Sequence, residues 1–92
     1  LGMFIKEIKP AEFERYGVSE KGVVIVGLDP DSEAAEKGLR PGDFITETTI
    51  SGKHERIVTS EQLLKLIEDA QKQGKKQVLL LINRGGVQRF IT

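Results

Sequence analysis

The chain has 92 residues, which is enough for one small domain with a single hydrophobic core and leaves no room for a second. Hydrophobic residues make up 38% and charged residues 30%, which excludes a disordered chain, and the absence of cysteine excludes a disulfide framework and a thiolate metal site. Fourteen basic residues balance fourteen acidic ones, which argues against a dedicated nucleic-acid binder.

The charges are unevenly distributed. All acidic residues lie within residues 1–69, whereas residues 70–92 carry five basic residues and no acidic one. Such a segment could dock an acidic partner, but a solvated strand edge guarded by lysines is the simpler interpretation. The longest apolar run, Val78 to Ile82, is too short to insert into a membrane, and residues 1–20 lack the regions of a signal peptide. We therefore expect any export signal to lie outside this segment.

The first part of the chain predicts two strands separated by a short helix. Apolar residues alternate along 1–6, which is the spacing of a strand with one apolar face. A short helix is expected over 11–16, because Pro10 suits a first helical turn and Gly17 can end the helix. The β-branched run 23–26 is too short for a helix and predicts a buried strand.

Residues 29–43 contain the signals of a short helix followed by a tight turn. Asp31 or Ser32 can cap the helix, and Gly38 fits the left-handed residue that ends it, after which Leu39 folds back on the last turn. The pair Pro41-Gly42 matches the centre of a type II turn.

The rest of the chain predicts a hairpin, one long helix and two final strands. The hairpin turns at Ser51-Gly52 with a return arm over 53–58, and Thr59 caps a helix that ends near Gln73, with Gln62 reaching back to complete a capping box. The final strands are expected over 78–83 and 87–92. Together the elements predict an α+β fold with a strongly curved antiparallel sheet of five or six strands, one longer helix and one or two short helices.

Four stretches of the sequence occur in an informative order: Leu1-Gly2-Met3, the run 22–26, the stretch 34–45 with Gly-Leu-Arg-Pro-Gly-Asp, and 78–86 ending in Asn-Arg-Gly-Gly. With them the whole chain, residues 1–92, resembles a single PDZ domain of the bacterial type found in HtrA (Deg) serine proteases such as DegP, with the permuted strand order of that type. The segment 16–18 and the Asn-Arg-Gly-Gly motif resemble the second, C-terminal PDZ domain of those proteases. The stretch 47–58 departs from the family because it is longer than the usual hairpin.

The resemblance implies a peptide-binding groove. Leu1, Gly2 and Met3 would form a loop whose backbone N–H groups bind a terminal carboxylate, with Gly2 leaving room for it. The peptide would add as a strand beside Met3, Phe4, Ile5 and Lys6.

The predicted helix has two apolar faces that compete for the core. Ser60, Leu64 and Ile67 share one face. The adjacent face consists of Leu63, Leu66 and Ala70. Periodicity alone favours a wide core stripe that includes both faces. The resemblance implies instead that the second face packs inward and the first faces the groove, where the last ligand side chain enters an apolar pocket made by Met3, Ile5, Leu64 and Ile67. A serine at position 60 implies little selection for Ser or Thr in the ligand.

Nothing in the sequence predicts catalysis, and no cofactor or metal is expected. His54, the only histidine, lies in a charged hairpin arm, and no Gly-x-Ser-x-Gly motif or phosphate-binding glycine loop occurs. The acidic residues at 29, 31 and 33 are better explained by capping than by calcium.

Three functional hypotheses remain open at this stage. The chain is a non-catalytic module that captures hydrophobic C-terminal peptides or unfolded segments for an attached serine protease, or it is an assembly module that joins the protease domain and sister subunits. The third hypothesis is a PDZ domain from another membrane or secretion protease system. A periplasmic location is implied by the resemblance alone.

Overall fold

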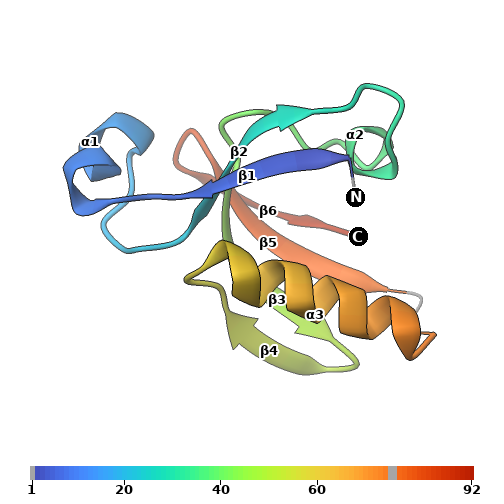
Figure 1. Ribbon diagram of the computed structural model, residues 1–92. Helices are drawn as coiled ribbons and strands as arrows, with labels where there is room; N and C mark the ends of the chain where they lie inside the picture. Colours follow the sequence, from blue (N-terminus) through green and yellow to red (C-terminus); the bar gives the residue numbers. More distant parts are fainter. Residues whose placement is uncertain (1, 75–76) are drawn as a thin grey trace.

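The structure is a computed structural model that describes residues 2–74 and 77–92 (Figure 1). Within these residues an antiparallel sheet has the strand order β1-β2-β3-β5-β6, and β4 pairs with β3 outside this path. The strands are β1 (Met3–Glu7), β2 (Val23–Leu28), β3 (Phe44–Ile50), β4 (Lys53–Arg56), β5 (Val78–Arg84) and β6 (Val87–Ile91). The helices are a 3₁₀ turn (Pro10–Glu12), α1 (Phe13–Tyr16), α2 (Glu33–Glu36) and α3 (Ser60–Lys72). The predicted α+β fold is confirmed, and the helix boundaries fall close to those expected.

The signals read between residues 29 and 43 act as predicted. The Ser32 side chain caps α2 by accepting a hydrogen bond from the Ala35 N–H group (3.2 Å). Gly38 and Gly42 both have φ of 95°, a conformation that favours glycine. Gly38 ends the helix, and Gly42 occupies the third position of the turn. The backbone between α2 and β3 therefore has few other conformations available to it.

The β3–β4 hairpin turns where the sequence predicted, but its second strand is shorter. Ser51 and Gly52 have φ of 52° and 78°, as a two-residue type I′ turn requires. Strand β4 ends at Arg56 and not at Val58, because Ile57 is fully buried in the core. Burial of this side chain turns the chain away from the hairpin and toward the start of α3.

The capping of α3 follows the prediction with one difference. Thr59 Oγ1 accepts a hydrogen bond from the Gln62 N–H group (3.1 Å), which makes Thr59 the cap. The Gln62 side chain reaches back as expected, but its Oε1 accepts from the N–H of Val58 (2.8 Å) and not from that of Thr59. Two hydrogen bonds of Gln62, one with Thr59 and one with Val58, therefore fix the start of α3.

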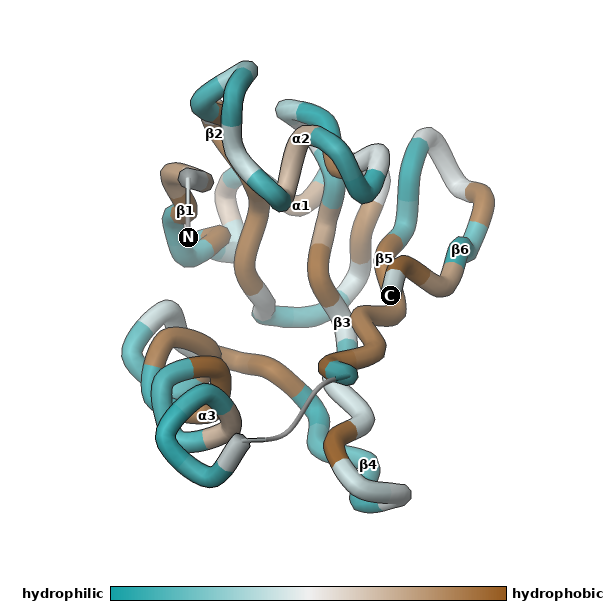
Figure 2. The backbone as a smooth tube through the Cα atoms, turned by 90° about the vertical axis from the view of Figure 1, so that its right-hand side faces the viewer, coloured by the Kyte–Doolittle hydropathy of each residue, from teal (hydrophilic) through white to brown (hydrophobic). Residues whose placement is uncertain are grey.

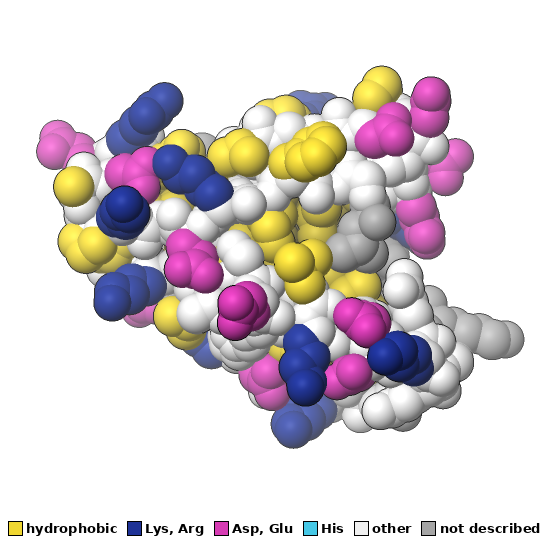
Figure 3. Space-filling model, viewed as in Figure 1, with side chains coloured by type: hydrophobic (Ala, Val, Ile, Leu, Met, Phe, Trp, Pro, Cys, Tyr) yellow, Lys and Arg dark blue, Asp and Glu magenta, His cyan; other side chains and the backbone are white. Residues whose placement is uncertain are grey.

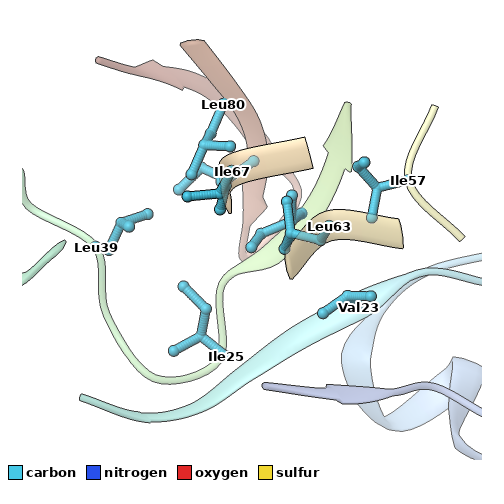
Figure 4. Close-up of a cluster of buried hydrophobic side chains, with 9 residues drawn as sticks. Val23, Ile25, Leu39, Ile57, Leu63, Ile67 and Leu80 are labelled. Atoms are coloured by element: carbon cyan, nitrogen blue, oxygen red, sulfur yellow. The ribbon is translucent and has the colours of Figure 1, made fainter. Parts of the chain in front are cut away.

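The main core lies between α3 and the concave face of the sheet (Figure 4). Leu63 and Ile67 point from α3 toward Val23 and Ile25 of β2 and toward Leu80 of β5. Viewed along the sheet, the hydrophobic stretches of β2, β3 and β5 lie at the centre and the outer side of α3 is hydrophilic (Figure 2). Each fully buried side chain of this size contributes about 1.5–3 kcal/mol.

A second, smaller cluster covers the opposite face of the sheet. Val24 and Phe44 are buried there with Ile8, and residues of α1 pack against them. The run 23–25 is therefore buried on both faces, which explains why it is apolar without alternation. Gly22 belongs to this arrangement, because a Cβ atom at that position would collide with the Phe44 ring.

Candidate functional site: an open strand edge beside helix α3

Helix α3 divides its apolar residues differently from either sequence interpretation. Leu63, Ile67 and Ala70 are buried, Leu66 is half-buried, and Leu64 is 42% exposed. Leu66 lies on the side of the helix that faces the β3–β4 hairpin, where it lines a separate cavity of about 410 Å³. Ile67 therefore serves the core and also reaches the surface beside β1, and Leu64 is the exposed apolar residue of this helix.

Strand β1 is an edge strand that pairs with β2 only, among the described residues. The Asp29 N–H group donates to the carbonyl oxygen of Gly2 (2.7 Å). In an antiparallel ladder this bond marks Met3 as a non-hydrogen-bonded position, whose own N–H and C=O groups point away from the neighbouring strand. The backbone of Met3 is thus directed toward the open edge.

The same alternation of hydrogen-bonded and non-hydrogen-bonded positions holds at the far end of β1. The Ile8 N–H group donates to the carbonyl of Gly22 (2.9 Å), which makes Glu7 a non-hydrogen-bonded position as well. A register shift in β2 between the partners of Phe4 and Ile5 preserves this alternation along the strand. Met3, Ile5 and Glu7 consequently present their backbone groups along the free edge, while Phe4 and Lys6 bond to β2.

The loop that precedes β1 is supported by the turn before α2. Gly2 has φ of 77°, and a Cβ atom on it would collide with the Ser32 side chain, with Ser32 Oγ at 2.7 Å. Ser32 cannot move freely, because its Oγ donates to the Asp29 carbonyl (2.6 Å) while capping α2. The glycine is therefore required by the protein's own packing; the reason given from the sequence, room for a carboxylate, is not needed to explain it.

A cavity of about 540 Å³ opens at this end of β1, between the Gly2 loop and α3. Its apolar lining includes Met3 of β1, Leu39 after α2, Ile67 of α3 and Leu80 of β5. Figure 3 shows the hollow between β1 and α3 with hydrophobic side chains at its floor. The cavity is large enough for a bulky apolar side chain.

The structure distributes the predicted site residues over three places. Gly2, Met3 and Ile67 line the cavity, and Ile5 packs against the main core beside it. Ser60 and Leu64 lie on α3 outside the cavity lining, Ser60 at the first position of the helix. Phe4, 66% exposed, and Lys6, which pairs with Glu12, lie outside the cavity lining, and their backbone groups bond to β2 and not along the free edge. Leu1 lies outside the described residues.

The sequence interpretation missed the contribution of α2 and β6 to this cavity. Glu33, Ala34 and Lys37 line one side of it, and Ile91 and Thr92 line another. Helical spacing of 34 and 37 was the available signal for the first group, since these positions share a face. No local signal relates the last strand to the first loop, because that contact depends on the curvature of the whole sheet.

Two of the three basic residues that the structure describes in the C-terminal segment, Arg84 and Lys72, are paired with acidic residues of the protein. Arg84 donates to both carboxylate oxygens of the buried Asp43 (2.8 Å each) and to the Gly38 carbonyl (2.7 Å). The hydrogen bonds to Asp43 raise the pKa of Arg84. Lys72 pairs with Glu68 (3.0 Å). These contacts favour a structural role for Arg84 and Lys72, whereas Arg89 is exposed and makes no ion pair among the described residues. The lysines at 75 and 76 lie outside the described part of the chain.

A curved sheet with a free edge at β1, a long helix beside that edge and an apolar cavity at its end define the PDZ fold. The structure of the HtrA3 PDZ domain bound to a phage-derived ligand, FGRWV, matches the whole chain with a TM-score of 0.76 at 22% identity and is itself covered over 79%. No family model matches the sequence.

DegP-like periplasmic serine endoproteases are similar to the chain in sequence. The protein from Brucella suis is 39% identical over 71 residues and that from Bartonella henselae 40% over 70, in each case 13% of the relative's length. A relative from Chlamydia pneumoniae is 26% identical over 93 residues, which covers 99% of the chain and 18% of the relative. The chain is therefore a PDZ domain of the HtrA/DegP family, and its matches span 13–18% of these relatives' length. None of the described helices is both long and apolar enough to cross a membrane.

Proposed function

We propose that this PDZ domain captures polypeptides with hydrophobic C-terminal ends by adding them as a strand to the free edge of β1. The observation that carries the proposal is the coincidence of two features: the backbone groups of Met3 and Ile5 point along an open edge, and that edge ends at an apolar cavity. An added strand would satisfy the backbone groups, and its last side chain would fill the cavity.

The proposed ligand is bound without catalysis by this domain. A serine protease domain elsewhere in the parent protein would cleave what the PDZ domain recruits, or would be regulated by its occupancy, and the names of the relatives support a periplasmic parent. Burial of one apolar side chain contributes about 1.5–3 kcal/mol, and ordering the peptide offsets part of this. We expect dissociation constants of about 1 μM or weaker.

The test uses the FGRWV peptide and its C-terminally amidated twin. The chain has no tryptophan, so the fluorescence of the peptide's tryptophan reports binding directly. Because a carboxylate accepts charge-assisted hydrogen bonds from backbone N–H groups, we expect the free acid to bind at least tenfold more tightly than the amide. Equal affinity for both peptides, or binding of neither, contradicts carboxylate capture.

Peptide binding by the variant Leu64→Glu tests independently where the groove lies. Leu64 is 42% exposed and one helical turn before Ile67, so an acidic residue there should weaken peptide binding by about tenfold and leave the melting temperature nearly unchanged. Phe90→Glu is the matched control, because Phe90 is 67% exposed on β6 at the other side of the sheet. Equal loss of binding in both variants, or unfolding of Leu64→Glu, counts against the assignment.

A second candidate function is assembly of the parent protease. It is favoured by the other edge of the sheet, where β6 exposes Val87 (55%) and Phe90 (67%). The size of the parent in solution, with and without this domain and with Phe90→Glu, tests it. If the oligomer is unchanged both without the domain and with Phe90→Glu, this candidate is wrong. The remaining hypothesis, a PDZ domain from another protease system, predicts a different catalytic domain in the parent protein.

A further inference from the structure

The two walls of the groove are joined at the end remote from the cavity. Glu7, the last residue of β1, accepts a hydrogen bond through Oε1 from the backbone N–H of Ser60 (3.0 Å), the first residue of α3. The two residues are 53 positions apart in sequence, so this is a tertiary contact across the groove. It places a carboxylate at the point where an added strand would leave the groove.

The direction of the Glu7 side chain follows from strand alternation as well as from this contact. Successive side chains of β1 point to opposite faces, so Glu7 shares the face of Met3 and Ile5, which pack toward the core and α3. Among the described residues Glu7 forms no ion pair with a lysine or arginine, whereas the neighbouring Lys6 is paired with Glu12. The negative charge of Glu7 is therefore available to a ligand.

The register of an added strand determines which ligand residue lies opposite Glu7. An antiparallel strand on the free edge would place its last residue opposite Met3, its third-last opposite Ile5 and its fifth-last opposite Glu7. Residues directly opposite each other on one face have Cβ atoms about 4.5–5.5 Å apart, close enough for an ion pair between long side chains.

We propose that Glu7 is a specificity-determining residue of the groove, which selects ligands with a basic side chain at the fifth position from their hydrophobic C-terminus. The inference rests on the proposed function, because it assumes strand addition to β1. It extends that function by a charge requirement upstream of the apolar end. The fourth-last residue of the ligand points to the opposite face and does not meet Glu7.

Acetylated peptides test the proposal in competition with FGRWV, since acetylation removes the charge of the peptide's own amino terminus. The probes are acetyl-Gly-X-Ala-Ala-Ala-Val, with Lys, Gln or Glu as X at the fifth-last position. A second series, acetyl-Gly-Ala-X-Ala-Ala-Val, has the same residues at the fourth-last position. Because exposed ion pairs are weak and like charges repel by a similar amount, we expect Lys to bind roughly fivefold more tightly than Glu in the first series and almost equally in the second.

Glu7→Gln should abolish this preference without loss of the fold. The amide oxygen can still accept the hydrogen bond from Ser60, so the melting temperature is expected to change little, while the Lys-to-Glu affinity ratio should fall to about one. Glu61→Gln is the matched control, because Glu61 is an exposed acid in the first turn of α3 and should leave the ratio unchanged.

The outcomes separate this inference from the function on which it rests. If all peptides bind with equal affinity, or if the preference follows Glu61 or appears at the fourth-last position, the inference is wrong and peptide capture stands. If none of the carboxylate peptides competes with FGRWV, strand addition itself fails.

Discussion

Gly2 combines two constraints that rarely coincide at one residue. Its φ of 77° is unfavourable for any residue with a side chain, and its missing Cβ leaves the space that Ser32 occupies. The Asp29–Gly2 hydrogen bond depends on this close approach and directs the Met3 backbone toward the open edge. Ser32, the cap of helix α2, thus positions Gly2, the first residue of the proposed groove. The helix begins at Glu33, 31 residues after Gly2.

The substitution Gly2→Ala should therefore lower the free energy of unfolding by more than the unfavourable backbone conformation alone would. Gly74 is the matched control, since its φ is 70° and a Cβ atom there would meet nothing within 4 Å. We expect Gly74→Ala to lower the free energy of unfolding by about 1–2 kcal/mol, and Gly2→Ala to do the same or more while also weakening FGRWV binding by about tenfold.

The double variant Gly2→Ala with Ser32→Gly separates the collision from the φ cost. Glycine is a tolerable helix cap, which costs only about a few tenths of a kcal/mol, so part of the lost affinity should return. Peptide titration and urea denaturation measure both effects. If the second substitution restores nothing, the collision with Ser32 is not what excludes a side chain at position 2.

Arg84 and Asp43 connect two of the sequence motifs that carried the family resemblance. Asp43 is 1% exposed, and its two oxygens accept hydrogen bonds from Arg84 and from the Arg40 N–H group (2.9 Å). The pair joins the turn after α2 to the end of β5. A buried charge that loses its partner is strongly unfavourable.

Arg84→Met should lower the free energy of unfolding by about 3 kcal/mol, because the Asp43 carboxylate would stay buried without its cation. Arg89→Met is the control, since Arg89 is exposed on β6 and makes no ion pair among the described residues, and it should change stability by less than about 0.5 kcal/mol. Urea denaturation of both variants at pH 7 decides the matter. Similar stabilities would show that the pair is not needed.

At the scale of elements, β1 is tied to the 3₁₀ turn that follows it through Lys6 and Glu12. The hydrogen bond from Lys6, and a second one from the Lys9 N–H group (3.2 Å), lower the pKa of Glu12 below its ordinary value of 4.5. The stabilisation is therefore fully present above pH 4.5 and is lost as the pH falls through the lowered pKa.

Glu12→Gln should flatten part of the acid limb of the stability profile below pH 4.5 and leave its neutral part little changed in shape. Glu14→Gln is the control, because Glu14 is exposed and makes no ion pair among the described residues. Thermal melts between pH 2 and 7 measure both profiles. Parallel profiles for the wild type and Glu12→Gln would contradict the assignment.

The elements show how far sequence reasoning reaches. Caps and turns are local, so Ser32, Gly42 and Thr59 could be predicted from short patterns. The partition of α3 could not, because Leu64 and Ile67 are both apolar and only the curvature of the sheet decides which one the core takes. The Glu7–Ser60 and Gly2–Ser32 contacts were likewise out of reach, since each joins segments whose separation in space depends on the complete fold.

At the scale of the whole molecule, the first loop and the last strand meet at the same cavity. Gly2 and Thr92 both line it, Gly2 from the loop before β1 and Thr92 from the end of the chain after β6. The Gly85-Gly86 turn between β5 and β6 is exposed and makes a local connection. An exposed turn of this kind is a place where a chain tolerates new ends.

A circular permutant tests this geometry. If a glycine linker long enough to span the cavity joins Thr92 to Leu1 and new ends are opened between Gly85 and Gly86, β6 becomes the first strand. We expect cooperative unfolding with a melting temperature within about 10 °C of the original, a change of roughly 1–2 kcal/mol. Circular dichroism and thermal melting provide the measurement. A permutant without a cooperative transition would show that the ends cannot be joined at this distance.

The presence of Gly2 and Thr92 in the lining of one cavity has a mechanical consequence for a longer polypeptide. Flanking segments on either side would enter and leave the domain at the rim of the same cavity. Under the proposed function, a ligand in this cavity would displace or order both tethers, so occupancy would change the reach and direction of the neighbouring parts together. The domain would then report binding to the rest of its protein through geometry at a single point, without any rearrangement of its own sheet.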